Sequence, residues 1–264
     1  MKKMIKHTVF FLVVIATLSP VLGQAFNPAA HVYIAGKVAS QVFPFTFDKI
    51  NLYYGSIAPD ISSYAPLEHW PYGFCETHYR FTKLPYAWWN PIQKAFAQGW
   101  QIHNERRPWG ADYYAHGTCS YAAASPCSLK LCNYGGYVPE QATILAAALE
   151  KDFPFLNLEL AHFAIEVAID ILLVDNKDHT LGEKLLSAAL FRSPGDVNLL
   201  ADVDGIGANW DTLSSAESTF RNLVINYATA LTLPDPLRMA LLGEIGVQLA
   251  NALGVMEIDS ATIQ

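Results

Sequence analysis

Apolar residues recur at helical spacing along most of the chain, and helix start signals precede several of these runs. Asn27-Pro28 opens a run that reaches Val38, and Asn90-Pro91 opens one that ends at His103. Asparagine caps the first turn of a helix, and proline suits the first helical position. The same spacing predicts further helices at Phe47–Ile57, Pro139–Asp152, Phe155–Val174, Leu181–Phe191, Asn198–Asp202, Ser214–Leu231 and Pro236–Leu253.

Strand patterns are nearly absent, because the chain has no alternating apolar runs of useful length and no Asn-Gly hairpin turn. Two segments, Ser62–Tyr86 and Gly117–Tyr137, are rich in Gly, Pro, Ser and aromatic residues and are expected to be irregular. The predicted fold is therefore all-α, a multi-helix bundle with long irregular loops. Phe155–Val174 is apolar on most of its surface, so we expect it to be a central, buried helix.

The first 23 residues have the pattern of a secretory signal peptide. Three lysines precede an apolar stretch at Val9–Leu18, and Val21 and Gly23 follow at a plausible cleavage site. The stretch is too short for a comfortable membrane span, and an uncleaved anchor is the alternative. We expect a secreted or periplasmic protein in which residues 24–264 form one helical domain. Its metal-site core would span residues 24–178, and its C-terminal helices residues 179–264.

Charge and composition narrow the classes of function. The formal net charge is −7, and residues 1–23 contain three lysines and no acid, so cleavage changes it to −10. An acidic chain of this kind is a poor binder of nucleic acid. It can still bind phosphate esters where metal ions supply positive charge locally. A hydrophobic content of 52% with 16% charged residues predicts a well-filled core.

The four cysteines, Cys75, Cys119, Cys127 and Cys132, show no Cys-x2-Cys zinc spacing. In an oxidising compartment two disulfides are expected, and three pairings are open. Candidate metal ligands are therefore sought among the histidines and carboxylates.

His162 and Glu166 lie four residues apart in the helical run ELAHFAIEVAID at 159–170. This spacing places an imidazole and a carboxylate on one face of a helix, where both can bind one metal ion. Buried there without a cation, they would destabilise the fold by on the order of several kcal/mol. Asp170 continues the same face, and we expect it to support His162 rather than bind metal.

Further candidate ligands precede this pair in separate segments. They are His31 in HVYIAGKV, Asp60 in GSIAPDIS, His78 in THYRF, His103 in GWQIH, and Asp112 and His116 in DYYAH. The order of these motifs resembles the zinc-dependent phospholipase C family, whose all-helical fold is shared with the S1/P1-type nucleases. The resemblance covers about residues 26–175 and is most specific around Asp60, His103 and His162.

The resemblance implies a cluster of two or three zinc ions bound by nitrogen and oxygen ligands. By the family's pattern, one ion would be held by Asp60, His78, His103 and Asp112. A second would be held by His116, His162 and Glu166, and a third by His31 with Asp112 bridging. Imidazole and carboxylate groups suit zinc, and a set of two histidines and one glutamate leaves an open position for water.

The chain departs from the family's pattern in two places. The helix with GW-x2-His usually continues to an aspartate four residues on, where this chain has Arg107. Asp112 is the expected substitute, and Glu105 is its rival. The family's secreted members also use an N-terminal tryptophan as a zinc ligand, whereas the predicted mature chain begins at Gln24 with no tryptophan nearby.

The predicted function is that of a secreted zinc-dependent phosphodiester hydrolase resembling phospholipase C, with phospholipid as the first expected substrate. A zinc-activated water would attack phosphorus, and Asp60 would also serve as its proton acceptor. His69 is a rival of His78 as a ligand, and His78 is favoured. Aromatic residues at 64–89 either pack under a loop or form a rim for peripheral membrane contact. The alternatives are a nuclease of the same fold, which the acidity disfavours, and a non-catalytic metal- or lipid-binding family member.

Overall fold

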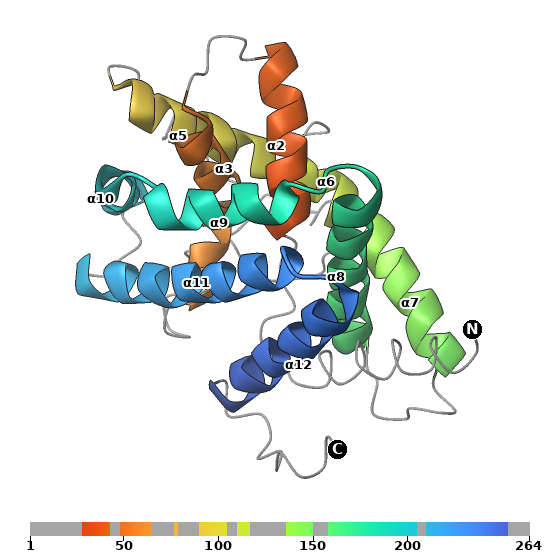
Figure 1. Cartoon of the computed structure of the whole chain (residues 1–264). Coiled ribbons are helices and arrows are strands. Elements are labelled where there is room, and N and C mark those ends of the chain that lie inside the picture. Colours follow the sequence, from red (N-terminus) through yellow and green to blue (C-terminus); the bar gives the residue numbers. More distant parts are fainter. Residues whose placement is uncertain are drawn as a thin grey trace, which may run out of the picture.

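The computed structural model describes residues 28–42, 48–64, 77–78, 90–104, 110–116, 136–149, 158–204 and 210–252. Within these residues every regular element is helical, which confirms the predicted all-α class (Figure 1). The elements are α2 (Pro28–Val42), α3 (Lys49–Ile57), the 3₁₀ helix η1 (Ala58–Tyr64), α5 (Pro91–His103), α6 (Ala111–His116), α7 (Tyr137–Leu149), α8 (Leu158–Asn176), α9 (Leu181–Phe191), α10 (Pro194–Asp204), α11 (Trp210–Leu231) and α12 (Asp235–Ala252).

The helix starts in the first part of the chain follow the capping rules. Asn90 accepts a hydrogen bond from the backbone N–H of Ile92 at 2.9 Å, and Pro91 is the first residue of α5, as predicted. Helix α2 likewise begins at Pro28. Helix α3 begins at Lys49 rather than at Phe47, because Asp48 is its cap and accepts a hydrogen bond from the backbone N–H of Asn51 at 3.0 Å.

The other predicted helices are present, with ends that differ by a few residues. Helix α9 has the predicted bounds, whereas α10 and α11 each begin four residues earlier than expected. The helix expected to end before Pro59 continues directly into η1, in which Pro59 is the second residue. Proline is tolerated in a first helical turn because its missing N–H has no intrahelical partner there.

Helix α3 occupies the centre of the fold. Residues Asn51–Ile57 are all buried, and α3 packs against α2, α5, α9 and η1. Helices α3 and α5 cross where Gly55 and Gly99 bring their backbones into contact. A Cβ atom on Gly99 would lie 2.0 Å from the carbonyl oxygen of Leu52, and one on Gly55 would lie 2.1 Å from that of Phe96. Both positions therefore require glycine.

The C-terminal helices complete the same core. Leu185 of α9 and Phe220 of α11 belong to the apolar cluster that contains Tyr54 of α3. Glu217 of α11 accepts hydrogen bonds from the Tyr54 hydroxyl and from Arg192 Nε, each at 2.6 Å. Helix α11 also packs against η1. Residues after 178 thus contribute to the core beneath the candidate ligands.

The prediction that the helix at Phe155–Val174 is central and buried is wrong. Helix α8 packs mainly against α7 and α2 at one side of the described fold (Figure 1). Leu158 and Leu172 are 45% and 60% exposed. A wide apolar stripe predicts that a helix packs against something, but it does not specify how many neighbours cover it. The centre belongs to α3, whose glycine permits closer approach.

Several predictions fall on residues outside the described ranges. They concern the signal peptide at 1–23, the four cysteines, His69, Glu105, Arg107 and most of the two irregular segments. Among the helices that the structure describes, none has both the length and the apolar character needed to cross a membrane.

Candidate metal centre

Four of the predicted ligands lie close together in the folded chain. His31 is in the first turn of α2, Asp60 is in η1, and His103 is the last residue of α5. His78 belongs to a short helical segment at residues 77–78. Each of the four residues is at most 3% exposed. The fold therefore gathers polar groups from distant segments in its interior, as the metal prediction requires.

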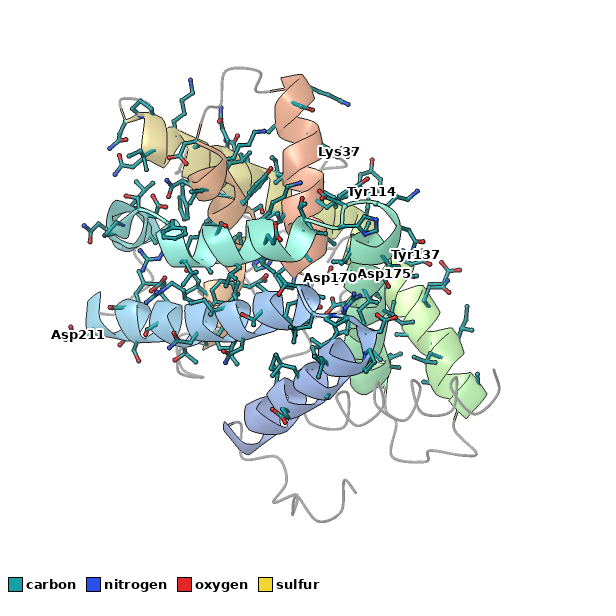
Figure 2. The ribbon with its side chains drawn as sticks, in the orientation of Figure 1. Lys37, Tyr114, Tyr137, Asp170, Asp175 and Asp211 are labelled. Atoms are coloured by element: carbon teal, nitrogen blue, oxygen red, sulfur yellow. The ribbon has the colours of Figure 1, made fainter. Side chains whose placement is uncertain are left out.

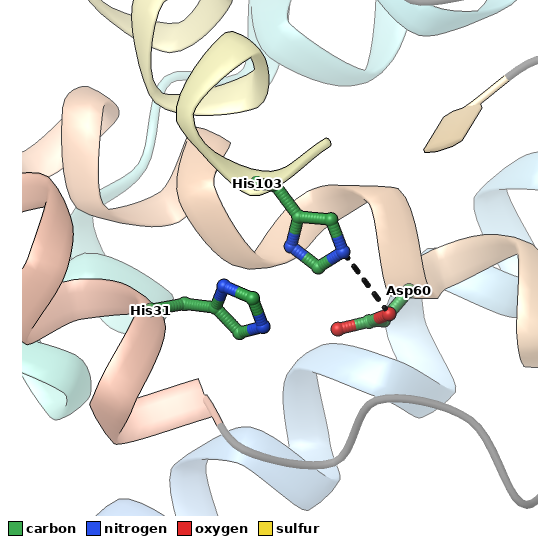
Figure 3. Close-up of side chains that lie close together, drawn as sticks. All are labelled: His31, Asp60 and His103. Carbon is green, nitrogen blue, oxygen red and sulfur yellow. Dashed lines mark ion pairs between the residues drawn. The ribbon is translucent and has the colours of Figure 1, made fainter. Parts of the chain in front are cut away.

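His31, Asp60 and His103 form a group of metal-binding size (Figure 3). One ligand atom from each residue lies within 4.8 Å of the other two. His103 Nε2 is 3.7 Å from Asp60 Oδ1, and the rings of His31 and His103 stack with their centroids 4.1 Å apart. The resemblance divides these residues between two ions, whereas in the structure His31 is close enough to share one ion with the other two.

His78 joins Asp60 and His103 from another segment. His78 Nε2 lies 3.1 Å from His103 Nε2 and 3.5 Å from Asp60 Oδ1. Ligand atoms on a tetrahedral zinc ion with bonds of about 2.0–2.1 Å are about 3.3 Å apart. The three separations of 3.1, 3.5 and 3.7 Å bracket this value. The three atoms thus fit one zinc ion with a fourth position left for a further ligand.

The protonation of His103 follows from its other ring nitrogen. His103 Nδ1 lies 2.8 Å from the backbone carbonyl oxygen of Ser56. A carbonyl oxygen only accepts hydrogen bonds, so Nδ1 carries the proton. In the neutral ring, Nε2 is then unprotonated and presents its electron pair to Asp60 and His78.

A chain of hydroxyl groups orients His78 in the same way. Ser62 Oγ donates a hydrogen bond to the carbonyl oxygen of Pro59 at 3.0 Å. The Thr77 hydroxyl lies 3.4 Å from Ser62 Oγ and 2.8 Å from His78 Nδ1, and a Thr77 hydroxyl that donates to Ser62 accepts from His78 Nδ1. With its proton on Nδ1, neutral His78 also presents an unprotonated Nε2 to the centre.

Residues in this arrangement could hold a cation. The Nε2 atoms of His78 and His103, 3.1 Å apart, converge beside the carboxylate of Asp60 in a buried environment. Such groups repel one another and lose hydration on burial, unless a proton or metal ion lies between them. Nitrogen and oxygen donors with their far sides held by hydrogen bonds form a ligand set typical of zinc.

The second predicted ligand set is only partly described. His162 Nε2 and Glu166 Oε1 lie 3.0 Å apart, which confirms that they share one face of α8, and Glu166 is buried. Asp112 and His116 lie in α6, which packs against α5 and α7. Their side chains lie outside the described part of the structure, so their roles as ligands stay predictions.

The expected role of Asp170 is wrong. Its carboxylate accepts hydrogen bonds from the backbone N–H groups of Ala29 and Ala30, at 3.0 and 2.8 Å, and from the Tyr227 hydroxyl at 3.0 Å. It therefore caps α2 instead of supporting His162, because the first-turn amides of α2 require an acceptor. Burial raises the pKa of Asp170 to about 8, while these hydrogen bonds lower it and the charge of Glu166 raises it further.

Three supporting residues were missed in the sequence: Ser56, Thr77 and Tyr227. Ser56 acts through its carbonyl oxygen, which every residue type possesses, so no sequence signal marks it. Thr77 is the immediate neighbour of His78, and this adjacency was an available signal. Tyr227 lies 57 positions from Asp170, and its role depends on α11 coming within hydrogen-bond distance of α8.

Comparison of the chain with protein-family models, with curated proteins and with solved structures finds no match. The geometry of the site and the order of the sequence motifs are therefore the basis for any function assigned to the chain.

Proposed function

We propose that this protein is a zinc-dependent hydrolase of phosphodiester bonds. The observation that carries the proposal is the convergence of the Nε2 atoms of His78 and His103 on the carboxylate of Asp60, at separations that suit one zinc ion. His31 lies within metal-binding distance of Asp60 and His103 and is the fourth candidate ligand. His162 and Glu166 offer a second pair of donor atoms 3.0 Å apart.

The reaction class is supported by the motif order that resembles zinc-dependent phospholipases C. When bound, zinc supplies positive charge to the phosphate oxygens and lowers the pKa of a water molecule toward neutrality. Asp60 accepts the proton of the attacking water. The bonds to Ser56 and Thr77 hold His103 and His78 with Nε2 toward the centre, so that neither ring must turn during the reaction.

Phospholipid is the proposed substrate, and the protein is proposed to act after secretion. The acidic net charge of the chain favours phospholipid over nucleic acid, because a nucleic-acid enzyme usually offers a basic surface to the phosphate backbone. A family member that binds metal without turnover is the alternative, and metal content alone does not separate it from the enzyme. Hydrolysis assays must therefore accompany metal analysis.

The test measures zinc per chain after dialysis and the hydrolysis of p-nitrophenyl phosphorylcholine, bis(p-nitrophenyl) phosphate and single-stranded DNA. Asp60→Asn and His103→Ala are expected to lower phosphodiester hydrolysis by more than about 100-fold, since loss of a group that only supports a ligand already lowers activity by 10–100-fold. His179→Ala is the matched control, because His179 is exposed in the turn after α8.

Zinc binding with hydrolysis of the choline ester in the wild-type and His179→Ala proteins, but not in the other two variants, supports the proposal. A wild-type protein that retains no zinc refutes it. Zinc binding without hydrolysis identifies the non-catalytic alternative, and preferential cleavage of DNA identifies a nuclease.

A further inference from the structure

The carboxylate of Asp170 joins three segments that are far apart in the sequence. It is fully buried on α8, accepts backbone hydrogen bonds from Ala29 and Ala30 of α2, and accepts a third from the Tyr227 hydroxyl of α11. Figure 2 labels Asp170 where α8 approaches the end of α11. Oδ1 binds one amide of α2 and Oδ2 binds the other, so both oxygens are engaged with the same helix end.

These amides are the donors that a helix cannot satisfy internally. Pro28 is the first residue of α2 and has no N–H, so the amides of Ala29 and Ala30 are the first two donors of the helix. In most helices the side chain just before the first turn accepts these bonds. Here the acceptor comes from a residue 140 positions later.

Asp170 and the helix end that it caps both lie close in sequence to candidate metal ligands. His31 directly follows Ala30, so His31 belongs to the same turn of α2 that Asp170 caps. Glu166 lies one helical turn before Asp170 on α8, and His162 lies one turn before Glu166. The cap therefore fixes the start of α2, and with it His31, against the helix that bears the second candidate ligand set.

We infer that Asp170 is a positioning residue for the metal centre, which sets His31 at binding distance from Asp60 and His103 by holding the first turn of α2 against α8 and α11. The inference depends on the proposed zinc site. The inference also gives helix α11 a part in metal binding through Tyr227, although the residues after 178 contain no predicted ligand.

The test is a double-mutant cycle on zinc affinity. The dissociation constant is measured by competition with a chromogenic chelator, and the absorption spectrum is recorded with cobalt in place of zinc. Asp170→Asn retains one acceptor oxygen but turns an NH₂ group toward an amide, so we expect zinc affinity to fall by about 10–100-fold. In the His31→Ala background the same substitution should have no further effect, because the cap acts through His31.

Two further variants keep the cycle informative. Asp175→Asn removes a carboxylate five residues later on the same helix, which is half-exposed and pairs with Arg238, and it should leave zinc affinity unchanged. Tyr227→Phe removes one of the three bonds to Asp170 and keeps both amide bonds, so its loss should be smaller but should also vanish with His31→Ala. If Asp170→Asn does not fold, the Tyr227→Phe cycle decides the question.

Failure of the inference differs from failure of the proposed function. Equal losses of affinity in the wild-type and His31→Ala backgrounds mean that Asp170 has only a general structural role, which overturns the inference. Unchanged affinity and cobalt spectrum in Asp170→Asn also overturn it. A wild-type protein that binds no zinc instead refutes the proposed function, and this result is known before any variant is compared.

Discussion

Replacement of Gly99 by alanine tests whether the close crossing of α3 and α5 holds the candidate metal ligands together. The new Cβ atom would lie 2.0 Å from the carbonyl oxygen of Leu52 and 2.7 Å from the backbone nitrogen of Ser56. Ordinary van der Waals contact requires about 3.4 Å or more. Because both neighbours are backbone atoms that cannot rotate away, the two helices must separate by at least about 1.4 Å.

This separation acts on the ligands directly. Ser56 O, which accepts the hydrogen bond from His103 Nδ1 at 2.8 Å, belongs to the turn that α5 would push away. Overpacking destabilises a core by about 1–3 kcal/mol, and the lost hydrogen bond adds about 1 kcal/mol. We therefore expect the free energy of unfolding to fall by about 2–4 kcal/mol, with weaker zinc binding because His103 moves away from Asp60.

The assay is urea denaturation followed by far-UV circular dichroism in the presence of a chelator, with zinc affinity measured separately. Gly195→Ala is the matched control, because the nearest atom to its Cβ, Ser193 Oγ, would be 3.5 Å away. Alanine is also favoured over glycine in a helix by up to about 1 kcal/mol. An unfolding free energy of Gly99→Ala within about 0.5 kcal/mol of wild type would refute the reasoning.

Two further predictions concern buried charges away from the metal centre. Burial raises the pKa of Asp196 from 3.8 to about 8, so the folded state holds a proton that the unfolded state has lost, and stability falls as pH rises from about 4 to 8. The unfolding free energy of Asp196→Asn minus that of wild type should therefore rise by up to about 5 kcal/mol between pH 4 and pH 8. A difference between the two proteins that stays the same at every pH would contradict this prediction. Arg192→Met should cost about 3 kcal/mol, because it removes the closer of the two arginines that pair with buried Glu217 and leaves Arg221 at 3.3 Å. Tyr54→Phe should cost only about 1–2 kcal/mol, and equal losses in urea denaturation would argue against the pairing with Arg192.

The helices were predictable because their signals are local. The Asn90-Pro91 start and the spacing of His162 and Glu166 depend only on residues within one or two turns, and both appear in the structure as expected. The starts of α10 and α11 were less predictable, since apolar spacing marks the boundaries of a helix only weakly. The sequence did not indicate the central position of α3. Glycine has a low helix propensity, so a glycine that permits a close helix crossing looks unfavourable when its own helix is considered alone.

The site was predictable as a set of residue types and not as a set of contacts. Sequence order suggested that His31, Asp60, His78 and His103 bind metal. That His31 and His78 both lie near Asp60 and His103 depends on how four separate segments meet. Asp170 illustrates the same limit. Asp170 lies on the same face of α8 as His162 and Glu166, yet it accepts hydrogen bonds from two backbone amides of α2. Every residue except proline has such an amide, so the sequence does not mark these partners.

The packing around α3 has a consequence for metal binding. The Gly55–Gly99 crossing and the Ser56 carbonyl bond to His103 use no metal ligand atom, so these contacts can hold His103 near Asp60 before an ion arrives. A preformed site binds its ion without first ordering the chain, which favours affinity. The same preformation keeps the electron pairs of His78 and His103 close together in the metal-free protein. Zinc should therefore raise the melting temperature of the protein, because an ion that binds only the folded state adds RT ln(1 + [L]/Kd) to its stability.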